Sequence, residues 1–93
     1  MIGSQARAGR FGILLGGGAN LIRDPRAGRN IEYISEDPLL TVVFAGRSIA
    51  GIQSNKIIST VKHFALNNYK ADRTVYSVKM SELAILATEL LAF

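Results

Sequence analysis

The sequence contains no cysteine and only one histidine, His63. It can therefore form no disulfide bond, no thiolate metal site and no cysteine nucleophile. A single histidine without a nearby cluster of carboxylates does not make a metal site, so none is predicted. The triplet Gly16-Gly17-Gly18 lacks both the next glycine of a dinucleotide loop and the lysine of a phosphate-binding loop. No cofactor is predicted either.

Long apolar runs and blocks of like charge are also missing. No apolar run is long enough to span a bilayer, and residues 1–10 lack the apolar stretch of a signal peptide, so no membrane association is predicted. The net charge is +4, but the basic residues are spread along the chain. This spread favours a solvated basic surface over a nucleic-acid partner. A small basic protein that binds an anion or nucleic acid is the alternative class.

The chain is short but has the composition of a globular protein. Hydrophobic residues make up 48% of it and charged residues 19%, which argues against a disordered tail. A compact chain of this size buries only roughly 64% of the surface that its unfolded form exposes. The 93 residues can therefore build one small core at most.

A strand–helix–strand unit is predicted in the first two thirds of the chain. Residues 11–15 form a short apolar run before the glycine triplet, and residues 57–61 form a run rich in β-branched side chains. Between them Asp37 caps a helix from Pro38 to about Gln53. The expected buried face of this helix consists of Leu39, Val42, Val43, Ile49 and Ala50. Such a connection predicts two neighbouring parallel strands.

The other segments have weaker patterns. Residues 19–36 show no period and predict an ordered loop. Residues 75–80 alternate in polarity and predict a short, half-exposed extra strand. Ser81 is the expected cap of a terminal helix, which reaches Phe93 without a capping residue or terminal glycine and so predicts a cut within the helix.

Two strings of residues resemble glycoside hydrolase family 3, the β-glucosidase type. They lie in LLGGGANLIRDPRAGRNIEYISEDPLLT (Leu14 to Thr41) and GIQSNKIISTVKHFALNN (Gly51 to Asn68), with a weaker match from Arg73 to Phe93. The strings GRN-x-E-Y-x-SEDP and KHF-x-x-NN are specific as a pair. Two departures stand out: Tyr69-Lys70 replaces the usual Gln-Glu, and Leu86-Ala87 replaces an Arg-Glu pair.

The resemblance implies a fold and an activity. The fold is a (β/α)8 barrel, of which residues 1–93 would be an internal α/β fragment of the N-terminal catalytic domain. The activity is hydrolysis of terminal β-linked glucose or a related small saccharide with retention, by a carboxylate nucleophile and a separate acid/base. Matching motifs imply that Arg29, Lys62 and His63 bind sugar hydroxyls. Both catalytic carboxyls would lie later in the barrel, so no catalytic residue is assigned here.

The same residues have plainer interpretations from their own chemistry. Arg29 suits sugar hydroxyls, or an ion pair with Glu32 or Asp24 that fixes the loop. His63 alone would fit a core histidine bonded to the backbone. Because adjacent strand residues point to opposite faces, Lys62 and His63 can share one sugar only if the backbone is irregular there, for example with a non-proline cis peptide. We expect Arg29 and the Lys62-His63 pair to converge beyond the C-terminal ends of the two strands.

The remaining acids and the small core complete the expectations. Asp24 and Glu32 are assigned as arginine partners, Asp37 as a cap and Glu36 as a loop charge. Two parallel strands need cover on both faces and paired edges. The isolated chain is therefore predicted to be oligomeric, molten or insoluble. A truncated reading frame that makes no stable product is a further alternative.

Overall fold

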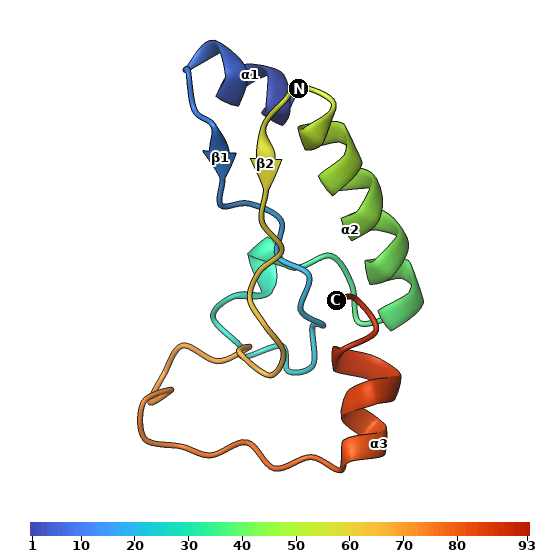
Figure 1. The fold of residues 1–93 in the computed structure, drawn as a ribbon. Helices are drawn as coiled ribbons and strands as arrows, with labels where there is room; N and C mark the ends of the chain where they lie inside the picture. The colour runs from blue at the N-terminus through green and yellow to red at the C-terminus, as the bar shows by residue number, and fades with distance from the viewer.

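The computed structural model describes all 93 residues and has a parallel pair of short strands connected through a long helix (Figure 1). Strand β1 covers Ile13–Leu14, helix α2 covers Pro38–Gln53 and strand β2 covers Ile58–Ser59. Ile13 lies opposite Ile58, and Leu14 lies opposite Ser59. The predicted strand–helix–strand unit is confirmed, although both strands are shorter than the sequence patterns suggested.

Helix α2 begins where the sequence predicted. The Asp37 carboxylate accepts a hydrogen bond from the backbone N–H of Leu40 at 2.7 Å, and Pro38 takes the first helical position. Both features suit a helix N-terminus, where the first backbone N–H groups have no partner within the helix. The cap therefore fixes the direction in which the chain enters the helix.

The predicted buried face of α2 is wrong. The residues that the structure buries are Thr41, Ala45 and Ile52, whereas Leu39 and Val43 are exposed. The helix carries apolar side chains on nearly every side, so its periodicity did not identify the side that meets the sheet. Tertiary packing made that choice.

A short N-terminal helix, α1 (Ile2–Ala8), was not predicted. It packs against α2, and Ala6 forms the small buried cluster with Ile52 and Ile57. Gly3 allows this approach, because a Cβ atom there would lie 3.0 Å from the Cα of Ile52. Seven residues with little apolar period give no strong helix signal, so only the contact with α2 reveals this element.

The sheet has one covered face and one uncovered face. Leu14 packs against the buried cluster beside α1 and α2. Because side chains alternate along a strand, the neighbouring apolar residues point the other way. That opposite face is 55–72% exposed at Phe11, Ile13, Leu15 and Ile58. The chain therefore leaves a contiguous apolar surface open to solvent.

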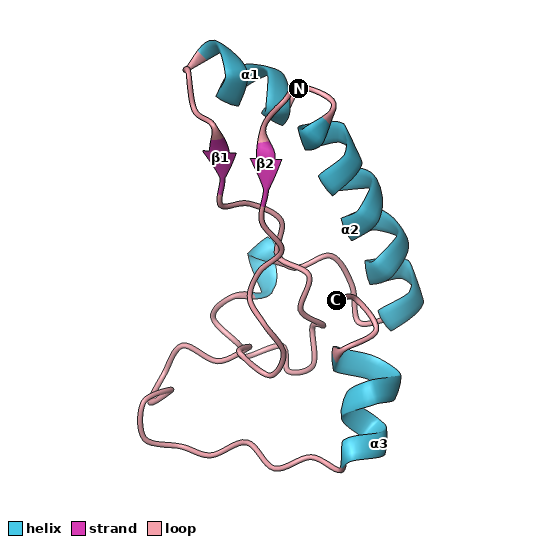
Figure 2. Ribbon diagram, viewed as in Figure 1, coloured by secondary structure: helices cyan, strands magenta, loops and turns pink.

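Much of the chain lies in long connecting segments (Figure 2). The predicted loop after β1 is confirmed and contains a single 3₁₀ turn, η1 (Asn30–Glu32). The molecule measures 41 × 26 × 20 Å and has a radius of gyration of 14.4 Å. A compact domain of this length has about 12 Å. The fold is thus an open, mixed α/β arrangement with few buried residues.

The C-terminal part differs from the sequence prediction in two respects. Residues 75–80 form no strand, because they pair with no neighbouring strand and alternation alone does not make one. The start of the terminal helix is confirmed: α3 (Glu82–Ala84) begins with Ser81 Oγ accepting a hydrogen bond from the Ala84 N–H at 3.3 Å. It continues as a π-helical turn, η2 (Ile85–Glu89). The prediction that the helix reaches Phe93 is wrong, because the helical turns end at Glu89. None of the helices is long and apolar enough to cross a membrane.

Candidate functional site

Two loops meet at Gly18, just beyond the ends of the parallel strands. Gly18 forms isolated parallel bridges with both Tyr33 and Lys62. Next to it, the Ala19 N–H donates to the Lys62 carbonyl at 2.7 Å, and the Lys62 N–H donates to the Gly17 carbonyl at 3.4 Å. The backbone after β1 therefore holds the loop that carries Arg29 beside the segment that follows β2.

The peptide bond between Lys62 and His63 is cis, which confirms the irregular geometry expected there. The backbone N–H of His63 donates to Oδ1 of Asn20 at 2.7 Å, and Asn20 is fully buried. The carbonyl of the same peptide accepts from the backbone N–H of Ala19. Residues that follow β1 thus bind both polar groups of this peptide.

Arg29 reaches the same place from the first loop. Its side chain is almost entirely buried; Nε donates to Oε1 of Glu32 at 2.7 Å, and Nη2 donates to Nε2 of His63. The predicted convergence is confirmed, and so is the ion pair with Glu32. The alternative partner is wrong, because Asp24 pairs with Arg26.

His63 is surrounded by positive charge. Since its Nε2 accepts a hydrogen bond from Arg29, the ring is neutral and carries its proton on Nδ1. Burial lowers the pKa of His63 first, and the charges of Arg29, Lys62 and Arg73 lower it further. Nδ1 of His63 and Nη1 of Arg29 are buried without a hydrogen-bond partner. Two N–H donors therefore remain unused at this site.

Lys62 completes the group of donors. Its ammonium lies 3.7 Å from Oε2 of Glu32, and both side chains remain about one-third exposed. The hydrogen bond from Arg29 lowers the pKa of Glu32, and nearby positive charges lower it further. Glu32 is thus a carboxylate in contact with two of the three residues assigned from sequence.

Sequence reasoning missed three supporting residues around this group. Asn20 holds the His63 backbone, as described above. The Tyr33 hydroxyl donates to the Asn67 carbonyl at 3.0 Å, and its ring lies edge-on to His63 with centroids 6.4 Å apart. The Asn68 side chain donates to the Leu21 carbonyl at 2.8 Å. Polar residues within an aperiodic loop carry no signal that distinguishes buried from exposed positions.

A buried ion pair ties the terminal helix to the site. Glu89 is almost wholly buried; its carboxylate accepts from Arg23 Nε and, at 3.4 Å, from the Leu66 N–H. Arg23 also donates to the Thr88 hydroxyl at 2.7 Å. The helical pattern of leucines concealed this carboxylate, because Glu89 lies next to the apolar positions of the same helix.

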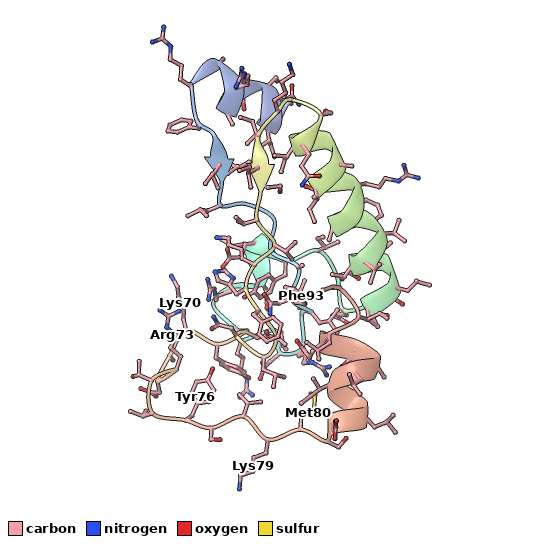
Figure 3. All side chains as sticks on the ribbon, in the orientation of Figure 1. Lys70, Arg73, Tyr76, Lys79, Met80 and Phe93 are labelled. Atoms are coloured by element: carbon pink, nitrogen blue, oxygen red, sulfur yellow. The ribbon has the colours of Figure 1, made fainter.

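The loop between Asn68 and Ser81 lies along the outside of the molecule. Its Tyr69 hydroxyl donates to the Asp24 carboxylate, and the rings of Tyr69 and Tyr76 meet edge-on with centroids 6.2 Å apart. In Figure 3 Tyr76 points toward the body of the protein, whereas Lys79 points away from it. The hydrogen bond to Asp24 therefore holds this loop against the segment that carries Arg29, whereas the aromatic contact is made within the loop.

Replacing Asn20 with alanine is expected to loosen the backbone at His63. The substitution leaves the His63 N–H without its acceptor, and an unmade bond at a buried group costs about 1–3 kcal/mol. Hydrogen exchange of the His63 amide in the 93-residue chain should accelerate by roughly tenfold to a hundredfold. Gln53→Ala, at an exposed position of α2, serves as the control. Unchanged exchange in the Asn20 variant would contradict the assigned role.

Comparison with known proteins places this arrangement among the glycoside hydrolases. Residues 16–93 match the Glycosyl hydrolase family 3 N terminal domain. The chain therefore belongs to glycoside hydrolase family 3, as its motifs predicted. Beta-glucosidase A from Butyrivibrio fibrisolvens is 46% identical over 91 residues, covering 98% of this chain and 11% of that protein. An exo-alpha-(1->6)-L-arabinopyranosidase from Bifidobacterium breve is 38% identical over 82% of this chain and 10% of that protein.

Solved structures show the same relationship. DesR, a beta-glucosidase from Streptomyces venezuelae in complex with D-glucose, matches with a TM-score of 0.93 and 38% identity, covering 97% of this chain and 12% of that one. Beta-glucosidase 3B from Thermotoga neapolitana in complex with glucose has a TM-score of 0.75 and 38% identity, covering 78% and 10%. The chain spans about a tenth of the length of these relatives.

Proposed function

We propose that this chain forms part of the sugar-binding wall of a family 3 hydrolase that cleaves terminal β-glucosidic bonds. The observation that supports this most is the convergence of Arg29, Lys62 and His63 beyond the ends of two parallel strands. Arg29 and His63 each keep a buried donor atom without a partner, and a sugar hydroxyl is a suitable acceptor. The relatives crystallised with glucose support the class of ligand.

We further propose that the chain is a piece of a (β/α)8 barrel. A parallel strand–helix–strand unit is the repeat from which such barrels are built. The uncovered sheet face, which includes Ile13 and Ile58, has the apolar character of a barrel interior. A cavity of about 270 Å³ lies between α2 and the sheet and is lined mainly by glycine and apolar side chains. Other segments of a barrel could pack there as well.

The chain itself supplies binding groups without a catalytic pair. Glu32 is bound to Arg29, Asp24 to Arg26 and Glu89 to Arg23, while Asp37 caps α2. We therefore assign no nucleophile and no acid/base to it. The anion-binding alternative has less support, because all three arginines of the loop from residue 19 to residue 36 already contact carboxylates. Binding to polynucleotide with a steep salt dependence would favour that alternative.

Sugar binding can be followed at His63, the only histidine in the chain. Chain labelled with ¹³C-histidine, and carrying Ile58→Lys to reduce self-association through the uncovered sheet face, is titrated with methyl β-D-glucoside. The His63 ring signals are expected to move and saturate. Arg29→Ala should weaken the response about tenfold or more, since hydrogen bonds involving charged groups contribute about 1.5–3 kcal/mol. Lys70→Ala, in the outer loop, should leave the response unchanged. An open-chain hexitol controls for bulk effects. No movement with the glucoside would contradict the proposed function.

The isolated chain is expected to associate with itself through the uncovered sheet face. Burial of exposed apolar side chains is the main driving force for association, and Ile58 alone is 61% exposed. Sedimentation velocity should show oligomers that Ile58→Lys reduces, whereas Val75→Lys, at an exposed loop position, should leave them unchanged. A monodisperse monomer with a cooperative thermal transition would contradict this prediction.

A further inference from the structure

Glu32 lies between the two cations of the sugar-binding wall. Its Oε1 accepts a hydrogen bond from Arg29 Nε at 2.7 Å, while Oε2 lies 3.7 Å from Lys62 Nζ. Arg29 and Glu32 belong to one turn, but Lys62 comes from the segment after β2. One carboxylate therefore joins two segments that are far apart in the sequence, using a different oxygen for each.

The cations need such a partner because they are close to the same imidazole. Arg29 donates directly to His63, and Lys62 is its neighbour in the chain. Two positive groups that face one ring repel each other, and the repulsion is strongest where water is excluded, as around the buried Arg29 side chain. Without a negative charge between them, the long Lys62 side chain is free to turn toward solvent.

The charges that act on His63 come from three parts of the structure. Arg29 and Glu32 belong to the first loop, Lys62 precedes the histidine, and Arg73 comes from the outer loop. The three cations lower the pKa of His63, whereas Glu32 raises it. The histidine therefore reports on the carboxylate without any ligand being present.

We propose that Glu32 is a positioning residue, which holds the Arg29 and Lys62 head groups side by side so that both donate, with His63, to hydroxyls of one sugar. This inference rests on the proposed function above. Glu32 acts through the two cations and does not itself bind the sugar. The sequence assigned it only as an arginine partner, since the contact with Lys62 exists only in the folded chain.

The first test is the titration of His63 in the labelled 93-residue chain. Glu32→Gln should lower the pKa of His63 below its value in the unmodified chain, because the only opposing charge is removed. Glu36→Gln, at an exposed position without an ion pair, should leave it unchanged. Glu32→Asp keeps the negative charge, so the pKa of His63 in that variant should stay close to its value in the unmodified chain. Loss of the fold would raise the pKa toward the ordinary histidine value, so a decrease cannot come from unfolding.

The second test needs no substitution at Glu32. In the unmodified chain, exchange of the Arg29 Nε–H with water should be much slower than that of Arg47, which is exposed and unpaired. Equal exchange rates at the two arginines would overturn the inference. So would a folded Glu32→Gln chain in which the pKa of His63 stays the same or increases. With methyl β-D-glucoside, Glu32→Gln should weaken binding about tenfold. An unmodified chain that does not respond to the sugar would instead contradict the proposed function.

Discussion

Gly18→Ala is expected to abolish the candidate site while leaving α2 in place. A Cβ atom at this position would lie inside the contact distance of the Glu32 carbonyl oxygen and 2.7 Å from the ring of Tyr33. Overpacking typically costs about 1–3 kcal/mol, and here the obstacle includes backbone that other contacts hold in place. We therefore expect Gly18→Ala to lower the free energy of unfolding by about 3 kcal/mol or more.

The measurement is best made in a full-length relative, whose other segments can pack against the exposed faces of this chain. The chain is placed in beta-glucosidase A from Butyrivibrio fibrisolvens in exchange for the matching 91 residues. Gly18→Ala in this chimera should lower both Tm and kcat/KM sharply. Gly46→Ala is the matched control, because a Cβ there meets nothing within 4 Å and alanine favours a helix by about 0.5–1 kcal/mol. Equal effects of the two substitutions would show that Gly18 is not a close contact.

The 93-residue chain by itself is expected to hydrolyse no aryl β-glucoside, whereas the chimera should. Retaining hydrolysis needs two carboxyl groups about 5–5.5 Å apart, one to attack the sugar carbon and one to protonate the leaving oxygen. Arg29, Lys62 and His63 supply hydrogen-bond donors only. Binding that is equally strong in the ground state and the transition state does little for the rate.

The local acids are poor substitutes for a catalytic pair. Hydrogen bonds from Arg26 and Tyr69 lower the pKa of Asp24, and the hydrogen bond from Arg29 lowers that of Glu32. Both groups are therefore ionised at neutral pH and cannot act as general acids there. Release of the aryl alcohol is followed against a buffer blank. Turnover by the chain that vanished in Asp24→Asn or Glu32→Gln would show that the catalytic groups had been misplaced.

The two departures from the family pattern have structural counterparts. Tyr69, which replaces a glutamine, donates to Asp24 and holds the outer loop to the first one. The terminal helix has no acid at Leu86-Ala87, but Glu89 reaches Arg23 from the π-helical turn. The C-terminal part of the chain is therefore attached to the site by specific polar contacts.

Local chemistry predicted several elements correctly. Asp37 and Pro38 identified the start of α2, and Ser81 identified the start of the terminal helix. Helix α1 was missed, and segment 75–80 was wrongly predicted as a strand. Both elements depend on whether a packing or pairing partner is present. The same reason explains the error in the buried face of α2. Local signals fix where an element begins, but not what it packs against.

The sequence by itself determined the family, the parallel strand–helix–strand unit and the identity of Arg29, Lys62 and His63 as candidate binding residues. These depend on motifs, caps and apolar runs, which are properties of neighbouring residues. Only the tertiary structure decided that Glu32 also contacts Lys62 and that Asn20 holds His63. Such contacts join residues 30 to 43 positions apart, and chain geometry alone does not specify them before the strands pair.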